Sequence, residues 1–301
     1  MERKIKGGFM NTDKIGSLEA ISLVIIVMIS HIILSLPNEI LTSTLSAAPL
    51  NVIYITSLVL IFYIIACKLF KPFHNQDILD VAEYVGGSIF RKIVSYIYIA
   101  HLIFISGILL LSFADTIKTI YLQSMPTELI CLVFILIAVL ANQFGFKSVS
   151  RTNAIFMPFI LITVLIIFLS LFTDFVPQRI FPILGYGGKE TFLTGATNIF
   201  AFGEIILLFL IRPNLKDTKQ AKKVGIISIL LSGSFLFITV LALLLLFPFI
   251  TGGEGALSIY MITRSIKFGK FFQRADALFI LIWALTFFSY LSVAMSYTLK
   301  I

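Results

Sequence analysis

The stretch TFLTGATNIFAFGEIILLFLI, residues 191–211, decides how this chain must fold. It is long enough to cross the hydrocarbon core of a membrane as a helix, which takes about 20 apolar residues. It contains one ionisable side chain, Glu204. Gly195, Asn198 and Gly203 also lie in it, and these residue types weaken or interrupt a helix. The stretch therefore predicts a membrane span with a polar interruption.

The composition of the whole chain extends this prediction. Of the 301 residues, 59% are hydrophobic and 13% are charged, and the mean hydropathy is +1.05. Such values exclude ordinary soluble domains. The net charge of +8 does not indicate a nucleic-acid partner, because the charges lie in short loops between apolar runs. The runs are continuously apolar, without the alternation of membrane strands, so we expect an all-α polytopic membrane protein.

Eight apolar runs are long enough to be membrane spans. The basic stretch 1–14 resembles the start of a signal peptide, but the apolar run after it exceeds a signal core and lacks a small-residue cleavage site. We therefore treat residues 1–301 as a single transmembrane domain. Its predicted spans are residues 17–36, 52–69, 93–114, 129–145, 154–172, 191–211, 224–249 and 277–297.

Lysine and arginine are distributed unevenly between the two sides that these spans define. If the N-terminus is cytoplasmic, 16 of the 23 lie in inside segments. This bias predicts that both termini are cytoplasmic. The outside loop 252–274 is long enough to hold short helices, and residues 77–92, DILDVAEYVGGSIFRK, have the spacing of an amphipathic helix on the cytoplasmic surface. The seven lysine and arginine residues in the outside loops are Lys118, Arg179, Lys189, Arg264, Lys267, Lys270 and Arg274.

The sequence contains no enzyme motif. It has no GxSxG, no HExxH, no Walker loop and no pair of carboxylates within one span. Cys67 and Cys131 lack the spacing of a zinc site, so we expect both to be reduced and packed as small hydrophobic residues. We therefore expect no catalytic residue, no metal and no cofactor.

Three ionisable side chains inside the spans are candidates for function. A polar group in hydrocarbon needs a partner or a wet cavity, so His31 and His101 each either line a cavity or bridge two helices. A carboxylate costs at least about 2.5 kcal/mol at such depth. Glu204 is thus either a structural hydrogen-bonding group or a group beside a substrate or proton path. Ser30 and Pro37, close to His31, predict a second interruption in the first span.

Three parts of the sequence form a recognisable pattern. They are the turn PILGYG before the sixth span, the Gly203–Glu204 step with Pro213 after it, and Arg274, Asp276, Phe279 and Trp283 at the entry to the eighth span. Together they resemble the spore germination permease family, the B subunits of germinant receptors, over nearly the whole chain. The resemblance implies an amino-acid permease fold of the APC superfamily, a LeuT-like inverted repeat of ten spans. This sequence then holds eight of the ten and lacks the last two.

The resemblance also implies a function. It predicts a subunit of the spore inner membrane that recognises a small nutrient, an amino acid, and triggers germination together with A and C subunits. In a LeuT-like arrangement the first, third, sixth and eighth spans form the pocket near the bilayer midplane. The predicted ligand contacts are therefore Ser30, His31, His101, Ile105, Asn198, Phe202, Glu204, Thr286, Ser289 and Tyr290.

The shape of that pocket should differ from the family's pattern. Relatives tend to place glycine or other small residues where this chain has Ser30, His31 and Ile32. Two other functions remain open at this point. The chain could be a proton- or cation-coupled amino-acid transporter, or a scaffold that assembles the other receptor subunits without binding ligand.

Overall fold

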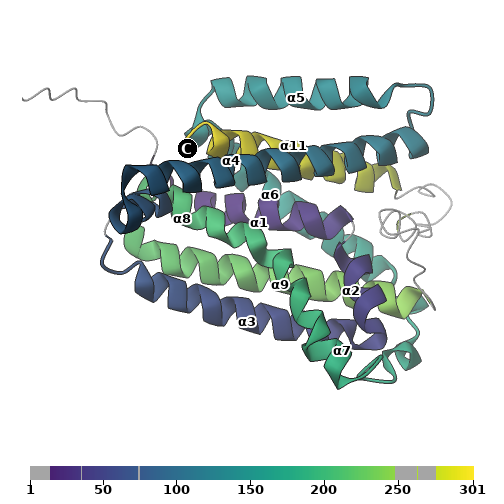
Figure 1. Ribbon diagram of the computed structural model, residues 1–301. Coiled ribbons are helices and arrows are strands. Elements are labelled where there is room, and N and C mark those ends of the chain that lie inside the picture. Colours follow the sequence, from purple (N-terminus) through teal and green to yellow (C-terminus); the bar gives the residue numbers. More distant parts are fainter. Residues whose placement is uncertain (1–13, 35, 74, 248–262, 264–275) are drawn as a thin grey trace, which may run out of the picture.

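A computed structural model describes residues 14–34, 36–73, 75–247, 263 and 276–301 (Figure 1). Within these residues the chain forms helices and no strand, apart from one β-bridge between Ile15 and Leu215. The predicted all-α membrane fold is confirmed. The short helices predicted in the loop 252–274 fall outside the described residues, which there include only Thr263.

The helices follow the predicted spans closely. Among the described residues, six helical segments are long and apolar enough to cross a membrane, and two further predicted spans are the shorter apolar helices α1 and α5. The α-helices are α1 (Ser17–Leu34), α2 (Leu36–Thr44), α3 (Ala48–Leu69), α4 (Ile78–Ile120), α5 (Thr127–Gln143), α6 (Phe146–Ser170), α7 (Gly188–Phe192), α8 (Leu207–Ile211), α9 (Ala221–Leu246) and α11 (Asp276–Thr298). The 3₁₀ segments are η1 (Leu45–Ala47), η2 (Phe172–Asp174), η3 (Pro177–Ile180), η4 (Thr194–Ile206), η5 (Arg212–Asn214) and η6 (Thr218–Gln220).

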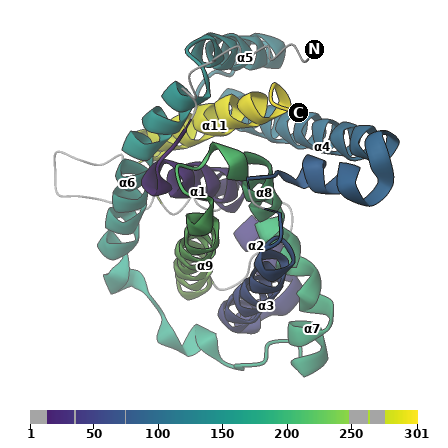
Figure 2. The ribbon, with the colours of Figure 1, turned by 90° about the vertical axis from the view of Figure 1, so that its left-hand side faces the viewer.

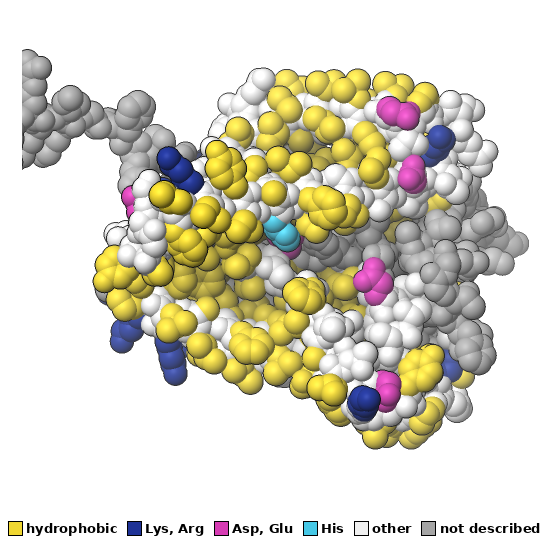
Figure 3. Space-filling view, in the orientation of Figure 1, with side chains coloured by type: hydrophobic (Ala, Val, Ile, Leu, Met, Phe, Trp, Pro, Cys, Tyr) yellow, Lys and Arg dark blue, Asp and Glu magenta, His cyan; other side chains and the backbone are white. Residues whose placement is uncertain are grey.

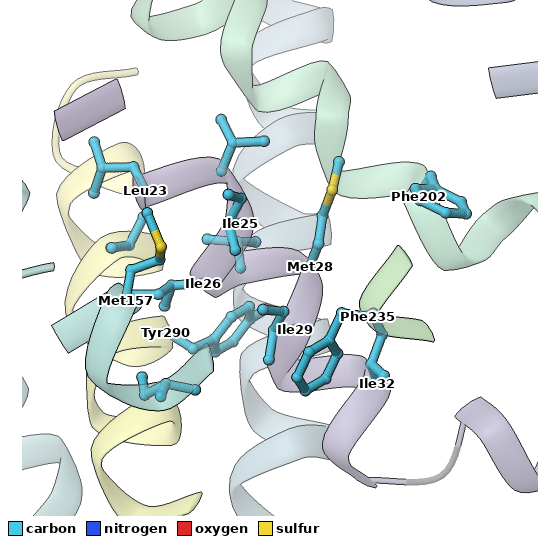
Figure 4. Packing of buried hydrophobic residues seen from close by; sticks show 14 of the residues in the cluster. Leu23, Ile25, Ile26, Met28, Ile29, Ile32, Met157, Phe202, Phe235 and Tyr290 are labelled. Atoms are coloured by element: carbon cyan, nitrogen blue, oxygen red, sulfur yellow. The ribbon is translucent and has the colours of Figure 1, made fainter. Parts of the chain in front are cut away.

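Helix α1 lies at the centre of the bundle. It is apolar on all sides, which is the pattern of a fully buried helix. Figure 2 shows α6, α8, α9 and α11 around it. Its side chains, such as Ile26 and Ile29, pack beside Met157 of α6, Phe235 of α9 and Tyr290 of α11 (Figure 4).

The outer helices turn large apolar side chains outward. Phe62 of α3, Phe104 of α4 and Ile155 of α6 are each more than half exposed, and the face in Figure 3 is mostly hydrophobic. In water such a surface would drive association, whereas in a bilayer it contacts lipid. The exposed apolar surface thus supports membrane insertion.

The first span has the interruption that its polar residues predict. Helix α1 ends at Leu34, and α2 begins at Leu36 with Pro37 in its first turn and leaves the line of α1 (Figure 1). After α2 the chain turns through Leu45, whose φ of 51° breaks the helical path, and returns as α3.

Two predicted boundaries need larger corrections. The amphipathic segment does form a helix, with a capping box between Asp77 and Asp80, but it ends at Gly87, where φ is 76°, rather than at residue 92. The rest of α4 continues directly into the span. Helix α6 begins at Phe146, not at residue 154, because Gly145 with φ of 82° supplies the turn before it. A search for uncharged runs misses both starts, since the first turn of α4 contains Asp80 and that of α6 contains Lys147.

The segments that the charge bias assigns to one side gather at one end of the bundle. Lys14 Nζ donates to the carbonyl oxygen of Pro213 at 2.7 Å. Arg151 of α6 pairs with Glu19 of α1. Lys300 lies 3.5 Å from the ring centroid of Phe146. The predicted assignment of segments to sides is consistent with these contacts.

Candidate functional site

The sixth span is not one α-helix. Its middle is η4, a 3₁₀ helix of 13 residues between the short helices α7 and α8. Runs of 3₁₀ helix longer than three or four residues are uncommon, and within a helix they often mark a hinge or strain. The interruption predicted within residues 191–211 is therefore present, and it takes the form of this 3₁₀ segment. Gly195, Asn198 and Gly203 all lie in η4, and their low helix propensity lowers the cost of leaving α geometry.

A buried asparagine holds the first half of η4 against α3. Asn51 is fully buried, and its Nδ2 donates to the carbonyl oxygens of Thr191 at 2.8 Å and Gly195 at 3.0 Å. Its Oδ1 accepts a hydrogen bond of 2.9 Å from Asn198 Nδ2, which also reaches Ser43 Oγ at 3.4 Å. The two bonds from Asn51 thus provide hydrogen-bond donors for two carbonyl oxygens where α7 passes into η4. Asn198 thus has a structural contact here, and its role toward ligand stays a prediction.

The second half of η4 places Glu204 beside His101 of α4. Glu204 is 6% exposed, and its Oε1 lies 3.5 Å from Nε2 of His101. The imidazole is 45% exposed, and Figure 3 shows a histidine with an acidic side chain beside it in a hollow of the hydrophobic face. One proton shared by an imidazole and a carboxyl leaves the pair without net charge, whichever group holds it. This pairing offsets the cost of a carboxylate at that depth.

Hydroxyl groups of α4 and α11 lie around the pair. Tyr290 of α11 is fully buried and lies near Glu204 and Ser106. Tyr297, about two turns further along α11, is also fully buried on the same side of that helix. Ser106 lines a groove of about 380 Å³ between α4, α5 and α11. Sequence reasoning missed Ser106 and Tyr297, although both are polar side chains in apolar spans and could have been included on that ground.

The other predicted contacts are only partly brought together. The Ser30 and Thr286 hydroxyls are buried and donate to carbonyl oxygens of their own helices, Val27 at 2.7 Å and Ile282 at 2.8 Å. Their oxygens can still accept a hydrogen bond. Phe202 is buried in the hydrophobic core, and the half-buried Ile105 packs against that core. The side chain of His31 lies outside the described residues.

Ser289 belongs to a different part of the structure. It lines a cavity of about 210 Å³ between α5, α6 and α11, together with Asn153 and Ser292. Its neighbour Tyr290 instead lies near Glu204. Successive residues of an α-helix point about 100° apart, which explains the division. The predicted set thus separates into a group around His101 and Glu204, the Asn198 network and the Ser289 cavity.

A family model described as "Spore germination protein" matches residues 14–301. The chain belongs to this family. Two relatives come from Bacillus subtilis (strain 168). Spore germination protein KB is 20% identical over 217 residues, which are 71% of this chain and 58% of that protein. Spore germination protein YndE is 21% identical over 293 residues, covering 93% of this chain and 78% of that protein.

The chain thus spans less than two thirds of the length of spore germination protein KB. Membership makes it a germination-related, multi-pass membrane protein. Its Glu204–His101 pair offers a carboxyl, an imidazole and neighbouring hydroxyls inside an apolar bundle. Such a group of side chains can bind a small polar molecule or carry a proton.

Proposed function

We propose that this chain is the membrane subunit of a spore germinant receptor that binds a small nutrient, an amino acid. Binding triggers germination through partner A and C subunits in the spore inner membrane, with both termini of the chain cytoplasmic. The proposal includes no catalytic step. Family membership and the names of the two relatives support the germination role. The observation that carries the ligand-binding part is the pairing of Glu204 on the 3₁₀ segment η4 with His101 on α4.

The charge balance of this pair suits an amino acid. A zwitterion carries one ammonium and one carboxylate, so the complex of ligand and pair gains no net charge when the ligand enters. The Glu204 carboxylate can accept a charge-assisted hydrogen bond from the ammonium group, and a protonated His101 can donate one to the ligand carboxylate. Buried apolar residues such as Phe202 would then contact the ligand side chain.

The fold proposed for this function is the LeuT-like inverted repeat. In such folds the free backbone groups of two interrupted spans face the ligand. The change of direction from α1 to α2 and the 3₁₀ segment η4 supply two interruptions, and α1 packs against η4. Enlarging Ser30 or Ile105 to Phe should reduce the germinant response while the chain stays abundant. An unchanged response in both variants would place the pocket elsewhere.

The ligand-binding part is tested with spores that carry Glu204→Gln in place of the parent chain. Gln keeps the size of the side chain and one hydrogen-bonding oxygen, so the protein should remain abundant in the membrane. It removes the charge, so the response to nutrient should fall. Glu83→Gln is the matched control, because Glu83 pairs with Arg91 at the exposed start of α4. A fully responsive Glu204→Gln variant would reduce Glu204 to a structural hydrogen-bonding group and sink the proposal.

A proton-coupled amino-acid transporter is the second candidate. It is favoured by the same imidazole–carboxyl pair, since one shared proton could move with the substrate. Uptake of labelled amino acid into vesicles, driven by a pH gradient and lost in His101→Gln, would support transport. Germination in response to nutrient without net uptake would support the receptor. If variants of the pocket leave the response intact but loss of the chain prevents assembly of the partner subunits, the chain is a scaffold.

A further inference from the structure

A strongly basic cavity that does not include Glu204 lies at the end of the bundle where α3 stops and α9 starts. Its volume is about 460 Å³. Five of the residues that line it are cationic and none is acidic, and basic side chains project from this end of the molecule in Figure 3. The lining cations are Lys68, Lys71, Arg212, Lys219 and Lys222, which come from three separate segments of the chain.

Arg212 is the buried member of this group. Its relative exposure is 9%, its Nη1 donates to the carbonyl oxygen of Phe73 at 2.8 Å, and its guanidinium lies 5.6 Å from the ring centroid of Phe70. Among the described residues no carboxylate lies within 4.0 Å of it, whereas Arg91 has two such partners and Arg151 has one. A buried cation without a counter-charge is costly, so an anion in the cavity would stabilise it.

The start of α9 adds to the positive potential. Ala221, the first residue of this 26-residue helix, lines the cavity, and the residue before it, Gln220, makes no side-chain capping bond. The N-terminus of a helix carries unsatisfied N–H groups and a partial positive charge, which favour bound anions. Lys219 and Lys222 flank this terminus. The cavity therefore combines a helix N-terminus with a buried guanidinium and four lysines.

The opposite wall is apolar and continues to the outer surface of α3. The cavity is lined there by Ile64, Phe70 and Phe209. The ring centroids of Phe70 and Phe209 are 4.6 Å apart. Beside them Ile61 and Leu69 are exposed on α3. A ligand with an anionic head and an apolar tail would contact both walls, whereas a free anion would use only one. Basic pockets at the membrane-facing end of helices commonly bind lipid head groups.

We propose that this cavity binds a phosphate group, and that the phosphate belongs to an anionic membrane lipid. The guanidinium of Arg212 contacts the phosphate oxygens together with Lys219 and Lys222, and the acyl chains leave along α3. The site is independent of the nutrient site proposed around Glu204. A bound lipid would hold the segment between α8 and α9 at the membrane surface. The residues just before α1 contact the same segment.

The test uses the full chain in nanodiscs of phosphatidylcholine with a minor share of phosphatidylglycerol, and native mass spectrometry counts the retained phosphatidylglycerol. The variant Lys219→Gln/Lys222→Gln removes two exposed lysines from the cavity. Attraction of roughly 1 kcal/mol per basic residue converts to about 10- to 30-fold weaker retention. The matched control is Lys216→Gln/Lys223→Gln, which removes the same charge from neighbouring residues that do not line the cavity. It should retain lipid like the parent.

A second variant, Arg212→Gln, keeps a donor for the Phe73 carbonyl and should lose retention even if its stability falls slightly. Equal losses in the test and control pairs, or a loss in neither, would overturn the site. A parallel arm adds inorganic phosphate to chain in phosphatidylcholine alone. Phosphate binding that depends on Lys219 and Lys222 without retained lipid would overturn the lipid assignment. Release of a partner subunit by the test pair, with lipid retention unchanged, would make the cavity a protein contact and also overturn it.

Discussion

Two consecutive apolar segments of this chain fold in different ways. The most apolar 18-residue window of residues 188–214 has a mean hydropathy of 1.8, and this segment contains the long 3₁₀ segment η4. The corresponding window of residues 221–246 has a mean hydropathy of 2.7, and this segment forms one uninterrupted α-helix, α9. Both contain glycines and hydroxyl side chains. Hydropathy therefore identifies two spans but does not say which of them keeps α geometry.

Gly203 of η4 has different surroundings from the glycines of α9. A Cβ on Gly225 of α9 would overlap the Tyr63 ring, and one on Gly233 would lie 2.7 Å from the Thr56 side chain, so α9 needs small residues to approach α3. A Cβ on Gly203 of η4 would meet nothing within 4 Å. The glycines of α9 thus serve close packing, and Gly203 serves the conformation of its own segment.

The largest effect is expected for Gly225→Ala. The new methyl group would push Tyr63 away and strain its hydrogen bond to the Ala221 carbonyl oxygen, which is 2.7 Å long. Overpacking of this kind costs about 1–3 kcal/mol of the free energy of unfolding. Thermal inactivation of the purified protein in detergent should show a lower midpoint. A midpoint equal to that of the parent would mean that α3 and α9 approach less closely than the comparison requires.

A smaller loss is expected for Asn51→Leu, which removes the bonds that hold the start of η4. The carbonyl oxygens of Thr191 and Gly195 would lose their donor, at a cost of about 1–3 kcal/mol for unpaired buried groups and less where they find another partner. Hydrogen–deuterium exchange should rise in residues 188–206 and stay unchanged in α9. Ser57→Ala is the control, because the Ser57 hydroxyl bonds only to its own helix. Equal changes in both segments would show that Asn51 stabilises the whole bundle rather than η4.

The sequence predicts the number and approximate place of the spans because hydropathy reports burial in lipid directly. It also identifies Glu204 and His101, since ionisable side chains are rare and costly inside a membrane. It could not pair them, because the pairing depends on how α4 crosses η4. It assigned Asn198 and Ser289 to one pocket, yet they face different neighbours. It overlooked Asn51, whose importance comes from three bonds to a segment far away in the chain.

The starts of α4 and α6 show a second limit. Both helices begin with charged turns, so a search for uncharged runs places their starts too late. The signals that could have corrected this are local. Asp77 and Asp80 have the spacing of a capping box, and Gly145 precedes α6 in a conformation that favours glycine. Local stop and start signals therefore locate helix ends better than hydropathy does.

The smallest effect on stability is expected for Gly203→Ala, and it has the opposite sign. The methyl group enters open space, and Ala is favoured over Gly by up to about 1 kcal/mol in a helix interior. The midpoint of thermal inactivation should therefore stay equal or rise slightly, while Gly233→Ala, the control in α9, should lower it. If η4 must change its winding when nutrient binds beside Glu204, restricting residue 203 should also reduce the germination response at unchanged abundance. A marked loss of stability in Gly203→Ala would show that Gly203 is packed like the glycines of α9, and the distinction between the two segments would fail.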